Sequence, residues 1–245
     1  MLLIILLVRP ARGAARQETD HKVIASKNLM PEMGDEIVLW HDYGSFALYR
    51  VTHEAWSQLP EQLRSRVQLV DDMNQLLVGE KPIDTQHVTV LQAEAAGEYN
   101  GESLHIIQFV GPIKDEWLKA VEATGADLVH YVANNGYLVW ADAASRQKLD
   151  GMAERSTFLQ ASIPYLSPFK LGPSLNIEQA SGNGSDELLV VTVQLYRHDG
   201  SRKSEKIIEE AMVDTLGPWE FVLNSQNISG TINGSDIPEI AGLAD

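Results

Sequence analysis

The order of strand and helix patterns between Leu104 and Lys170 constrains the fold of this chain more than any other feature. The segment is predicted to run strand, helix, strand, tight turn, strand, helix, strand. Branched and aromatic residues favour the strands, and Asn134-Asn135-Gly136 marks the tight turn because Asn and Gly accept positive φ angles. This order places two helices on one face of a four-stranded antiparallel sheet, which is a ferredoxin-like α+β sandwich.

The second half of that segment, a strand followed by a helix and a closing strand, recurs twice elsewhere in the chain. The repeated strands contain Phe46, Tyr137 and Ser229, and Tyr137 follows Phe46 by 91 residues while Ser229 follows Tyr137 by 92. Similarity at a nearly constant spacing indicates related modules. The third copy reaches a helix start at 235–240 and then Asp245, so no closing strand is predicted for it.

We therefore predict an α+β chain of tandem ferredoxin-like βαββαβ sandwiches, the last one truncated, preceded by a partial ββαβ module. A length of 245 residues accommodates several small domains. The predicted segments are a signal peptide at 1–15, the partial module at 35–84, a linker at 85–103, a ferredoxin-like module at 104–171, a linker at 172–186, and a second ferredoxin-like module without its final strand at 187–245.

The two outer modules carry their own local signals. In the partial module we expect a helix over His53–Leu63 with Thr52 as its N-cap, followed by an apolar closing run at 67–78. Pro60 weakens the middle of that helix because proline has no backbone N–H. In the last module we predict a strand at 187–196, a helix capped by Ser204 and reaching Leu216, and strands at 219–223 and 228–232.

The charge of the chain argues against two classes of partner. Asp and Glu number 34 against 19 Lys and Arg, which gives a net charge of −15. Nucleic-acid phosphates and anionic membrane surfaces both bind clustered basic residues, so neither is an expected partner. The chain has no cysteine, which removes disulfides and thiolate metal sites from consideration.

The N-terminus is apolar over residues 1–8 and continues into the small residues Gly13–Ala15. An apolar run followed by small residues is typical of a secretory signal peptide. Eight residues cannot span a bilayer as a helix, which takes about 20. We therefore predict export, a secreted mature chain, and no membrane insertion of that mature chain. The basic residues that usually precede such a run are missing, so a misassigned start is the alternative.

We predict no catalytic, cofactor-binding or metal-binding residues. The seven histidines are scattered and do not form the close spacings of a zinc site. His105 and His130 lie on predicted strands, where each is either a pH sensor or, as we favour, an ordinary partly buried histidine. Tyr137 and Trp140 could stack on nucleic-acid bases, but the acidic charge favours packing in a core or against a protein partner.

Two short polar patterns also have a functional and a plain interpretation. Asn183, Asn227 and Asn233 each begin an Asn-x-Ser sequon, which matters only in a host that glycosylates. The runs 183–186 and 233–236 both read Asn-Gly-Ser-Asp and suggest calcium. Neither has the regular acidic spacing and closing Glu of an EF-hand loop, so we interpret both as turns.

Several segments resemble a known family. Leu104–Leu118 and Thr124–Val139 resemble the region ahead of the catalytic domain in secreted bacterial subtilisin-like serine proteases. Residues 187–244 resemble a second such module, and Asp42–Phe46 resembles the leading part of the same proteins. The resemblance implies a propeptide-like inhibitor or folding assistant, whose sheet docks on two helices of the protease. The last module departs from the family pattern because it reaches Asp245 without a fourth strand.

The catalytic pattern of that family requires an Asp, a His and a Ser acting together. Its signatures Asp-Thr-Gly, His-Gly-Thr and Gly-Thr-Ser do not occur in the sequence. We therefore expect a noncatalytic chain that belongs to a subtilisin-like serine endopeptidase, with the catalytic domain of the cognate protease as its partner in cis or in trans. The alternative is an extracellular protein-binding or structural repeat array that is not attached to a protease.

Overall fold

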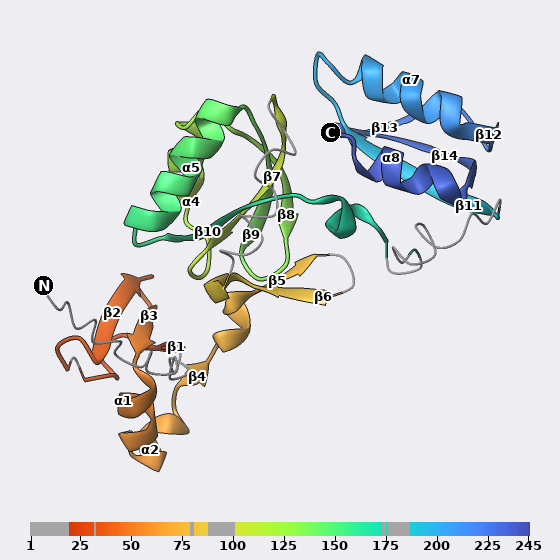
Figure 1. The fold of residues 1–245 in the computed structure, drawn as a ribbon. Helices are drawn as coiled ribbons and strands as arrows, with labels where there is room; N and C mark the ends of the chain where they lie inside the picture. The colour runs from red at the N-terminus through yellow and green to blue at the C-terminus, as the bar shows by residue number, and fades with distance from the viewer. Residues whose placement is uncertain (1–19, 32, 79–80, 88–100, 173–174, 176–186) are drawn as a thin grey trace, which may run out of the picture. The chain divides into compact units, whose positions relative to one another are not determined.

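The computed structural model describes residues 20–31, 33–78, 81–87, 101–172, 175 and 187–245. The described part of the chain is α+β, and its strands form three four-stranded sheets and one two-stranded sheet, all paired antiparallel (Figure 1). It divides into two compact units, 1–71 and 72–245. The predicted signal peptide, most of the linker at 85–103 and nearly all of the linker at 172–186 lie outside the described residues.

The first unit contains a sheet in the order β2-β3-β1-β4. Its elements are β1 (His21–Ser26), β2 (Ile37–Asp42), β3 (Phe46–Val51), α1 (His53–Gln58), α2 (Glu61–Arg64) and β4 (Gln68–Leu69). Val23, Ile37 and Val51 are completely buried in its core. Because β1 pairs with both β3 and β4, a central strand of this sheet precedes residue 35, where the predicted module begins.

The predicted helix His53–Leu63 is interrupted, and the closing run is shorter than predicted. Thr52 caps α1 as expected, since its Oγ1 accepts a hydrogen bond from the Ala55 N–H at 3.2 Å. Pro60 ends the helix because it holds the preceding residue in an extended conformation, and Leu59 has ψ 134°. The apolar run 67–78 supplies only the two residues of β4 to this sheet.

The central module, in the second unit, has the strand order β10-β7-β9-β8. Its elements are β7 (Ser103–Phe109), α4 (Asp115–Glu122), β8 (Asp127–Val132), β9 (Gly136–Ala141), α5 (Ala143–Arg155), β10 (Leu159–Pro164) and the 3-10 turn η3 (Ser167–Lys170). This is the predicted βαββαβ order with the ferredoxin-like arrangement of its strands. Trp117 of α4 stacks on Phe109 of β7 at 5.9 Å between ring centroids, which anchors the helix layer.

The turn between β8 and β9 confirms the predicted hairpin, with one difference. The two left-handed residues are Asn134 and Asn135, at φ 67° and 64°, because asparagine tolerates that region. Gly136 instead begins β9. A side chain there would collide with Leu76, so glycine is needed for close packing at this position.

A separate hairpin precedes the central module. It consists of β5 (Gln75–Val78) and β6 (Lys81–Asp84), between the 3-10 turns η1 (Asp71–Asn74) and η2 (Thr85–His87). Its apolar side chains form a core with Ile106 of β7 and Ile163 of β10. The hairpin thus belongs to the second unit, although the sequence placed it in the partial module at 35–84.

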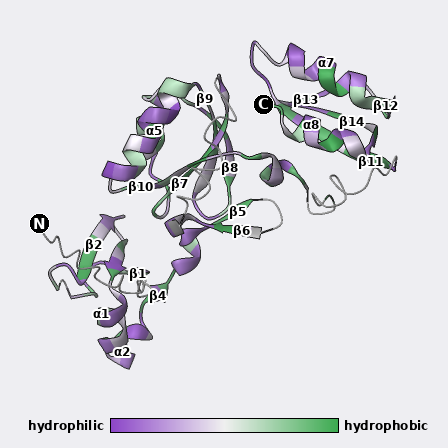
Figure 2. Cartoon of the chain, in the orientation of Figure 1, coloured by the Kyte–Doolittle hydropathy of each residue, from purple (hydrophilic) through white to green (hydrophobic). Residues whose placement is uncertain are grey.

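The C-terminal module has the strand order β11-β14-β12, with β13 also paired to β14. Its elements are β11 (Leu188–Tyr196), α7 (Arg202–Ala211), β12 (Met212–Thr215), β13 (Glu220–Val222), β14 (Ser225–Asn233), the 3-10 turn η4 (Gly234–Asp236) and α8 (Ile237–Ala241). In α7 a hydrophobic band lies between charged turns (Figure 2), and Ile208 from that band is completely buried.

The predicted helix through Leu216 is wrong beyond Ala211. Residues Met212–Thr215 form β12 because they pair with β14 and satisfy its backbone groups. Ser204 lies inside α7, and Ser201 is the residue that precedes the helix.

All three modules share one strand order. Reading each sheet from its closing strand gives β4-β1-β3-β2 in the first unit and β10-β7-β9-β8 in the central module. The C-terminal module has the same order without the first member. The repeat inferred from the strands near Phe46, Tyr137 and Ser229 corresponds to β3, β9 and β14, which occupy the same position in the three sheets.

Candidate binding site

The helix-free face of the central sheet is covered by the chain itself. Leu76 of β5 is completely buried against this face, together with Ile106 of β7. Polar groups hold the same contact: the Gln160 side-chain amide donates to the Thr85 hydroxyl at 2.8 Å and to the Met73 carbonyl at 3.2 Å. The face of this module opposite its helices, which the predicted sandwich leaves open, is therefore not bare, because residues 72–78 and 81–87 occupy it.

The corresponding face of the C-terminal sheet is exposed. We define the open face as the side of the sheet that carries Leu188, Val190, Thr192 and Gln194 of β11. Val190 is 73% exposed. The partners of these residues on β14 are polar, and Thr192 and Ser229 join hydroxyl groups at 2.8 Å. The open face is therefore a mixed apolar and polar surface, which at its Gln194 end shares a groove with Val129 and Tyr131 of the central module.

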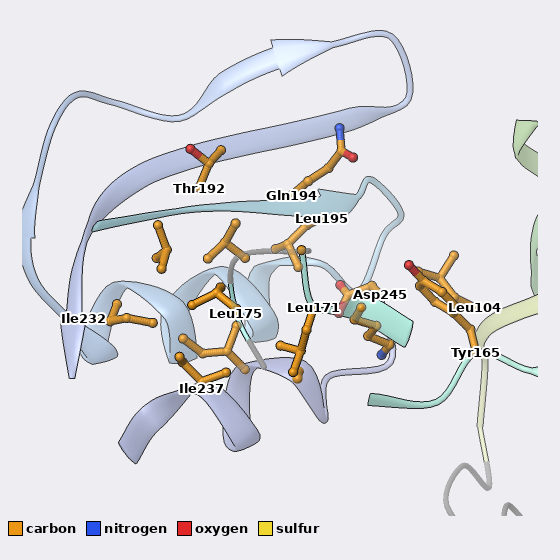
Figure 3. A pocket seen from close by; sticks show the side chains of 16 residues that line it. Leu104, Tyr165, Leu171, Leu175, Thr192, Gln194, Leu195, Ile232, Ile237 and Asp245 are labelled. Carbon is orange, nitrogen blue, oxygen red and sulfur yellow. The ribbon is translucent and has the colours of Figure 1, made fainter. Parts of the chain in front are cut away.

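A groove of about 330 Å³ runs beside β11, lined mainly by apolar side chains and also by Lys170 and Asp245. Five consecutive residues, 191–195, line it, as do Leu171 and Leu175 from the segment after η3. Figure 3 shows Leu171, Leu175 and Ile237 gathered between the sheet and α8, while the side chains of Thr192 and Gln194 point away from them. Consecutive residues of a strand alternate between its two faces, so this groove follows the edge of the strand.

His105 lies in a buried polar chain on the helix side of the central sheet. The Ser162 hydroxyl donates to Asp150 Oδ1 at 2.7 Å, and His105 Nε2 lies 2.8 Å from the same hydroxyl oxygen. Burial, with a smaller contribution from the charge of Arg146, lowers the pKa of His105 from 6.5 to about 3. Burial also raises the pKa of Asp150.

The direction of these hydrogen bonds opposes nucleophilic chemistry. The single proton of the Ser162 hydroxyl is directed to Asp150, so neutral His105 donates its Nε2 proton to the serine oxygen. An activated serine needs the reverse, with the histidine accepting the hydroxyl proton. The lowered pKa also keeps His105 neutral at physiological pH, which contradicts the pH-sensor interpretation of this residue.

The other side chains singled out in the sequence do not converge on one site. His130 is exposed on β8. Trp140 is buried and lies 4.2 Å from the His198 ring centroid, so it packs inside the second unit. Tyr137 meets Tyr131 edge-on at 5.9 Å. Packing, rather than base stacking, accounts for the two aromatic residues of β9.

In the polar Asn-Gly-Ser-Asp run at 233–236, Asn233 ends β14 and the other three residues form η4. Asn233 donates to Asp236 Oδ2 at 3.1 Å, which closes a local turn as predicted. Asn227 lies on β14 within a sequon, whereas the sequon at Asn183 is outside the described residues. Within the described ranges, His, Asp and Glu side chains form no group of three that could hold a metal ion.

Sequence reasoning missed two histidine clusters that join distant parts of the chain. In the first unit, Asp71 Oδ2 lies 2.6 Å from His21 Nδ1, and His21 Nε2 lies 3.1 Å from His53 Nδ1. In the C-terminal module, His198 Nε2 lies 3.0 Å from Asp245 Oδ2. Because the members of each cluster are far apart along the chain, no local pattern could have indicated them.

The C-terminal cluster has an orientation that suits structure rather than catalysis. The Gly200 N–H donates to His198 Nδ1 at 3.0 Å, so the ring proton lies on Nε2 and points to Asp245. Ser204 also donates its hydroxyl proton to the Asp245 carboxylate. The carboxylate accepts both hydrogen bonds and holds the segment after α8 against α7.

Comparisons with known proteins cover part of the chain. Residues 62–166 match the model of a domain of unknown function, DUF8729. The match extends from α2 through the β5–β6 hairpin to the end of the central module, so it includes the sheet together with its cover. No curated protein and no solved structure matches the chain. Among the described residues, no helix is long and apolar enough to cross a membrane.

Proposed function

We propose that this chain is the noncatalytic, propeptide-like region of a secreted subtilisin-like serine protease. In this role it acts as a folding assistant, inhibitor or docking module for the catalytic domain, in cis or in trans. The family resemblance of Leu104–Val139 and of 187–244 motivates the proposal. The observation that carries it is the open face of the C-terminal sheet, because an uncovered sheet face with apolar residues is a docking surface for a protein.

The C-terminal module, rather than the central one, is the docking module in this proposal. The central sheet has helices on one face and the strands β5 and β6 on the other, so a protease helix would first have to displace the hairpin. The open face requires no such displacement. Leu188 and Val190 lie at one end of that face, where their side chains are exposed to a partner.

The proposal is tested by mixing the purified chain with a mature subtilisin-family protease. We expect slower cleavage of a chromogenic peptide or faster refolding of the denatured protease, at micromolar concentrations of the chain. Val190→Asp should abolish the effect because it places a charge in the contact. Leu69→Asp changes a residue that is 44% exposed on β4 of the first unit and serves as the matched control.

A lack of any effect of the wild-type chain on either cleavage or refolding would reject the protease proposal. One observation then favours the second candidate, an extracellular protein-binding or structural repeat array. Three modules share one strand order, and the central module is closed by its own chain. Repeated modules with internal covers suit a spacer or a scaffold, and the coding sequence downstream distinguishes the two candidates by the presence or absence of a catalytic domain.

The proposal also includes export. Residues 1–15 carry the apolar run and small residues expected of a signal peptide. Expression of the full sequence in a bacterial host, followed by N-terminal sequencing of the protein in the medium, tests this part. A protein that stays inside the cell with Met1 intact would remove the secreted location and would leave the docking role to be judged by the protease assay.

A further inference from the structure

The outer edge of β11 is the position where the other two modules carry a fourth strand. In the first unit β4 pairs antiparallel with β1, and in the central module β10 pairs antiparallel with β7. In the C-terminal module β14 lies on one side of β11, and no described strand lies on the other. The other two modules therefore show which kind of element pairs at this position, namely an antiparallel strand.

Two backbone hydrogen bonds show which groups of β11 point outward. The Gly234 N–H donates to the Glu187 carbonyl at 3.0 Å, and the Arg197 N–H donates to the Asn224 carbonyl at 2.9 Å. Between these bonds the register of β11 and β14 is continuous. Since paired and outward groups alternate along an antiparallel strand, the odd-numbered residues bond to β14. Val190, Thr192 and Gln194 direct their N–H and C=O groups to the free edge.

This edge lacks the features that protect exposed strands from pairing. β11 has nine residues without a charge, a proline or a register shift. The edge strands in the sheets of the first unit and the central module are protected: β2, β8 and β10 have register shifts, and β4 is only two residues long. Edge strands of natural proteins are usually protected from pairing by charges, bulges or short length. Because β11 has none of these features, its outward backbone groups can pair with another strand.

The side chains that line the groove indicate which kind of strand could pair with β11. Val191 and Ile237 line the groove beside the edge, and Leu171 and Leu175 pack against the same core. The remaining space is where the inward side chains of a fourth strand would enter. A second copy of β11 could not fill it, because its own inward residues, such as Leu195, are already buried in its own core. The occupant must bring free apolar side chains at alternate positions.

We propose that the edge of β11 binds an extended peptide segment of a partner protein, which adds as an antiparallel fourth strand. Backbone hydrogen bonds to residues 190–194 supply the pairing, and alternate apolar side chains fill the groove. The net charge of −15 favours a neutral or basic segment over an acidic one. This site needs no protease for its detection, so it stands or falls separately from the proposed function.

The experiment titrates the chain into a fluorescein-labelled peptide, KTVTVTVK, and follows fluorescence polarisation. Two further peptides carry N-methyl groups on alternate backbone nitrogens, one set for each edge of the strand. We expect saturable binding of the parent peptide, and binding weaker by about tenfold or more for one methylated peptide only, because only one edge faces β11. Equal binding of all three peptides, or no saturable binding up to about 1 mM protein, would overturn the proposal.

A pair of variants tests the protein side of the contact. Val190→Pro removes one outward N–H and leaves the pairing with β14, since proline is tolerated where that N–H faces solvent. We expect it to weaken peptide binding by about tenfold or more, whereas Val190→Thr retains the N–H and stays within about twofold of the wild type. Unchanged binding by a folded Val190→Pro chain would contradict the site.

Sedimentation of the chain alone completes the test. We expect a monomer at increasing protein concentration, since a second copy leaves the groove unfilled. A dimer that Val190→Pro disperses would assign the edge to a second copy and overturn the proposal. If Val190→Pro does not fold, the methylated peptides on the wild-type chain still decide between edge pairing and nonspecific binding.

Discussion

The central and C-terminal modules have the same strand order, yet one is closed and the other is open. The central sheet has its fourth strand, β10, and a covering hairpin whose Leu76 is completely buried. In the C-terminal sheet no described strand occupies the position that β10 has in the central sheet, and Val190 on its open face is 73% exposed. The difference shows that a shared topology does not determine which surfaces are available, because each cover comes from residues outside the module.

The largest difference in stability is expected between two variants that each shorten an apolar side chain, one on the helix-free face of the central sheet and one on the open face. Leu76→Ala should lower the free energy of unfolding by about 2–5 kcal/mol, because it leaves a cavity under the hairpin. Val190→Ala should lower it by about 0.5 kcal/mol or less, because the side chain is already in solvent. Urea unfolding followed by tryptophan fluorescence measures both. Similar losses for the two variants would contradict a closed and an open face.

A smaller effect is expected where the hairpin approaches the sheet most closely. Gly136→Ala should destabilise the chain by about 1–3 kcal/mol, because the new Cβ would collide with Leu76 and lie 3.0 Å from the Val132 Cβ. Gly101→Ala is the control, since no atom lies within 4 Å of its Cβ position. The double variant Gly136→Ala/Leu76→Ala should lose less free energy of unfolding than the sum of the losses of the two single variants. Strictly additive losses would show that the two residues do not touch.

Acid should weaken the central module through His105. Its folded pKa of about 3 lies below the ordinary value of 6.5, so between these values the unfolded chain binds a proton that the folded chain does not. The stability is therefore complete above about pH 6.5 and declines as the pH falls, by about 2 kcal/mol between pH 6.5 and pH 5.

The variant His105→Gln should lose this part of the acid sensitivity, because glutamine does not titrate and can still donate to Ser162. Urea unfolding at the two pH values gives the change for the wild type and the variant. The exposed His130→Gln should retain the wild-type difference and serves as control. A wild type and a His105→Gln variant with equal acid sensitivity would show that His105 is not buried in its neutral form.

The smallest effect is expected for a polar contact on the open face. Thr192→Val removes the 2.8 Å contact with the Ser229 hydroxyl but keeps a branched side chain suited to a strand. We expect a change of about 0.5 kcal/mol or less in the free energy of unfolding, since the hydroxyl of Ser229 remains accessible to water. A loss above about 1 kcal/mol would indicate that Thr192 is covered in solution, and so would contradict the open face.

Local signals predicted most of the elements in the central module. The hairpin at Asn134-Asn135 and the left-handed Gly125 at φ 100° follow from the preferences of single residues. Predictions failed where a distant partner overrides such preferences. Met212–Thr215 looked helical but pairs with β14, and the partial module was predicted to begin at residue 35 although β1 is a central strand of its sheet.

The sequence alone determined most of the order of strands and helices and the threefold recurrence of one pattern, because these depend on neighbouring residues and short spacings. Only the tertiary structure decided that residues 75–84 cover the central sheet, that His105 is buried beside Ser162, and that β11 has a free edge. Burial and edge exposure depend on which distant segments meet, and the periodicity of a strand does not specify its partner.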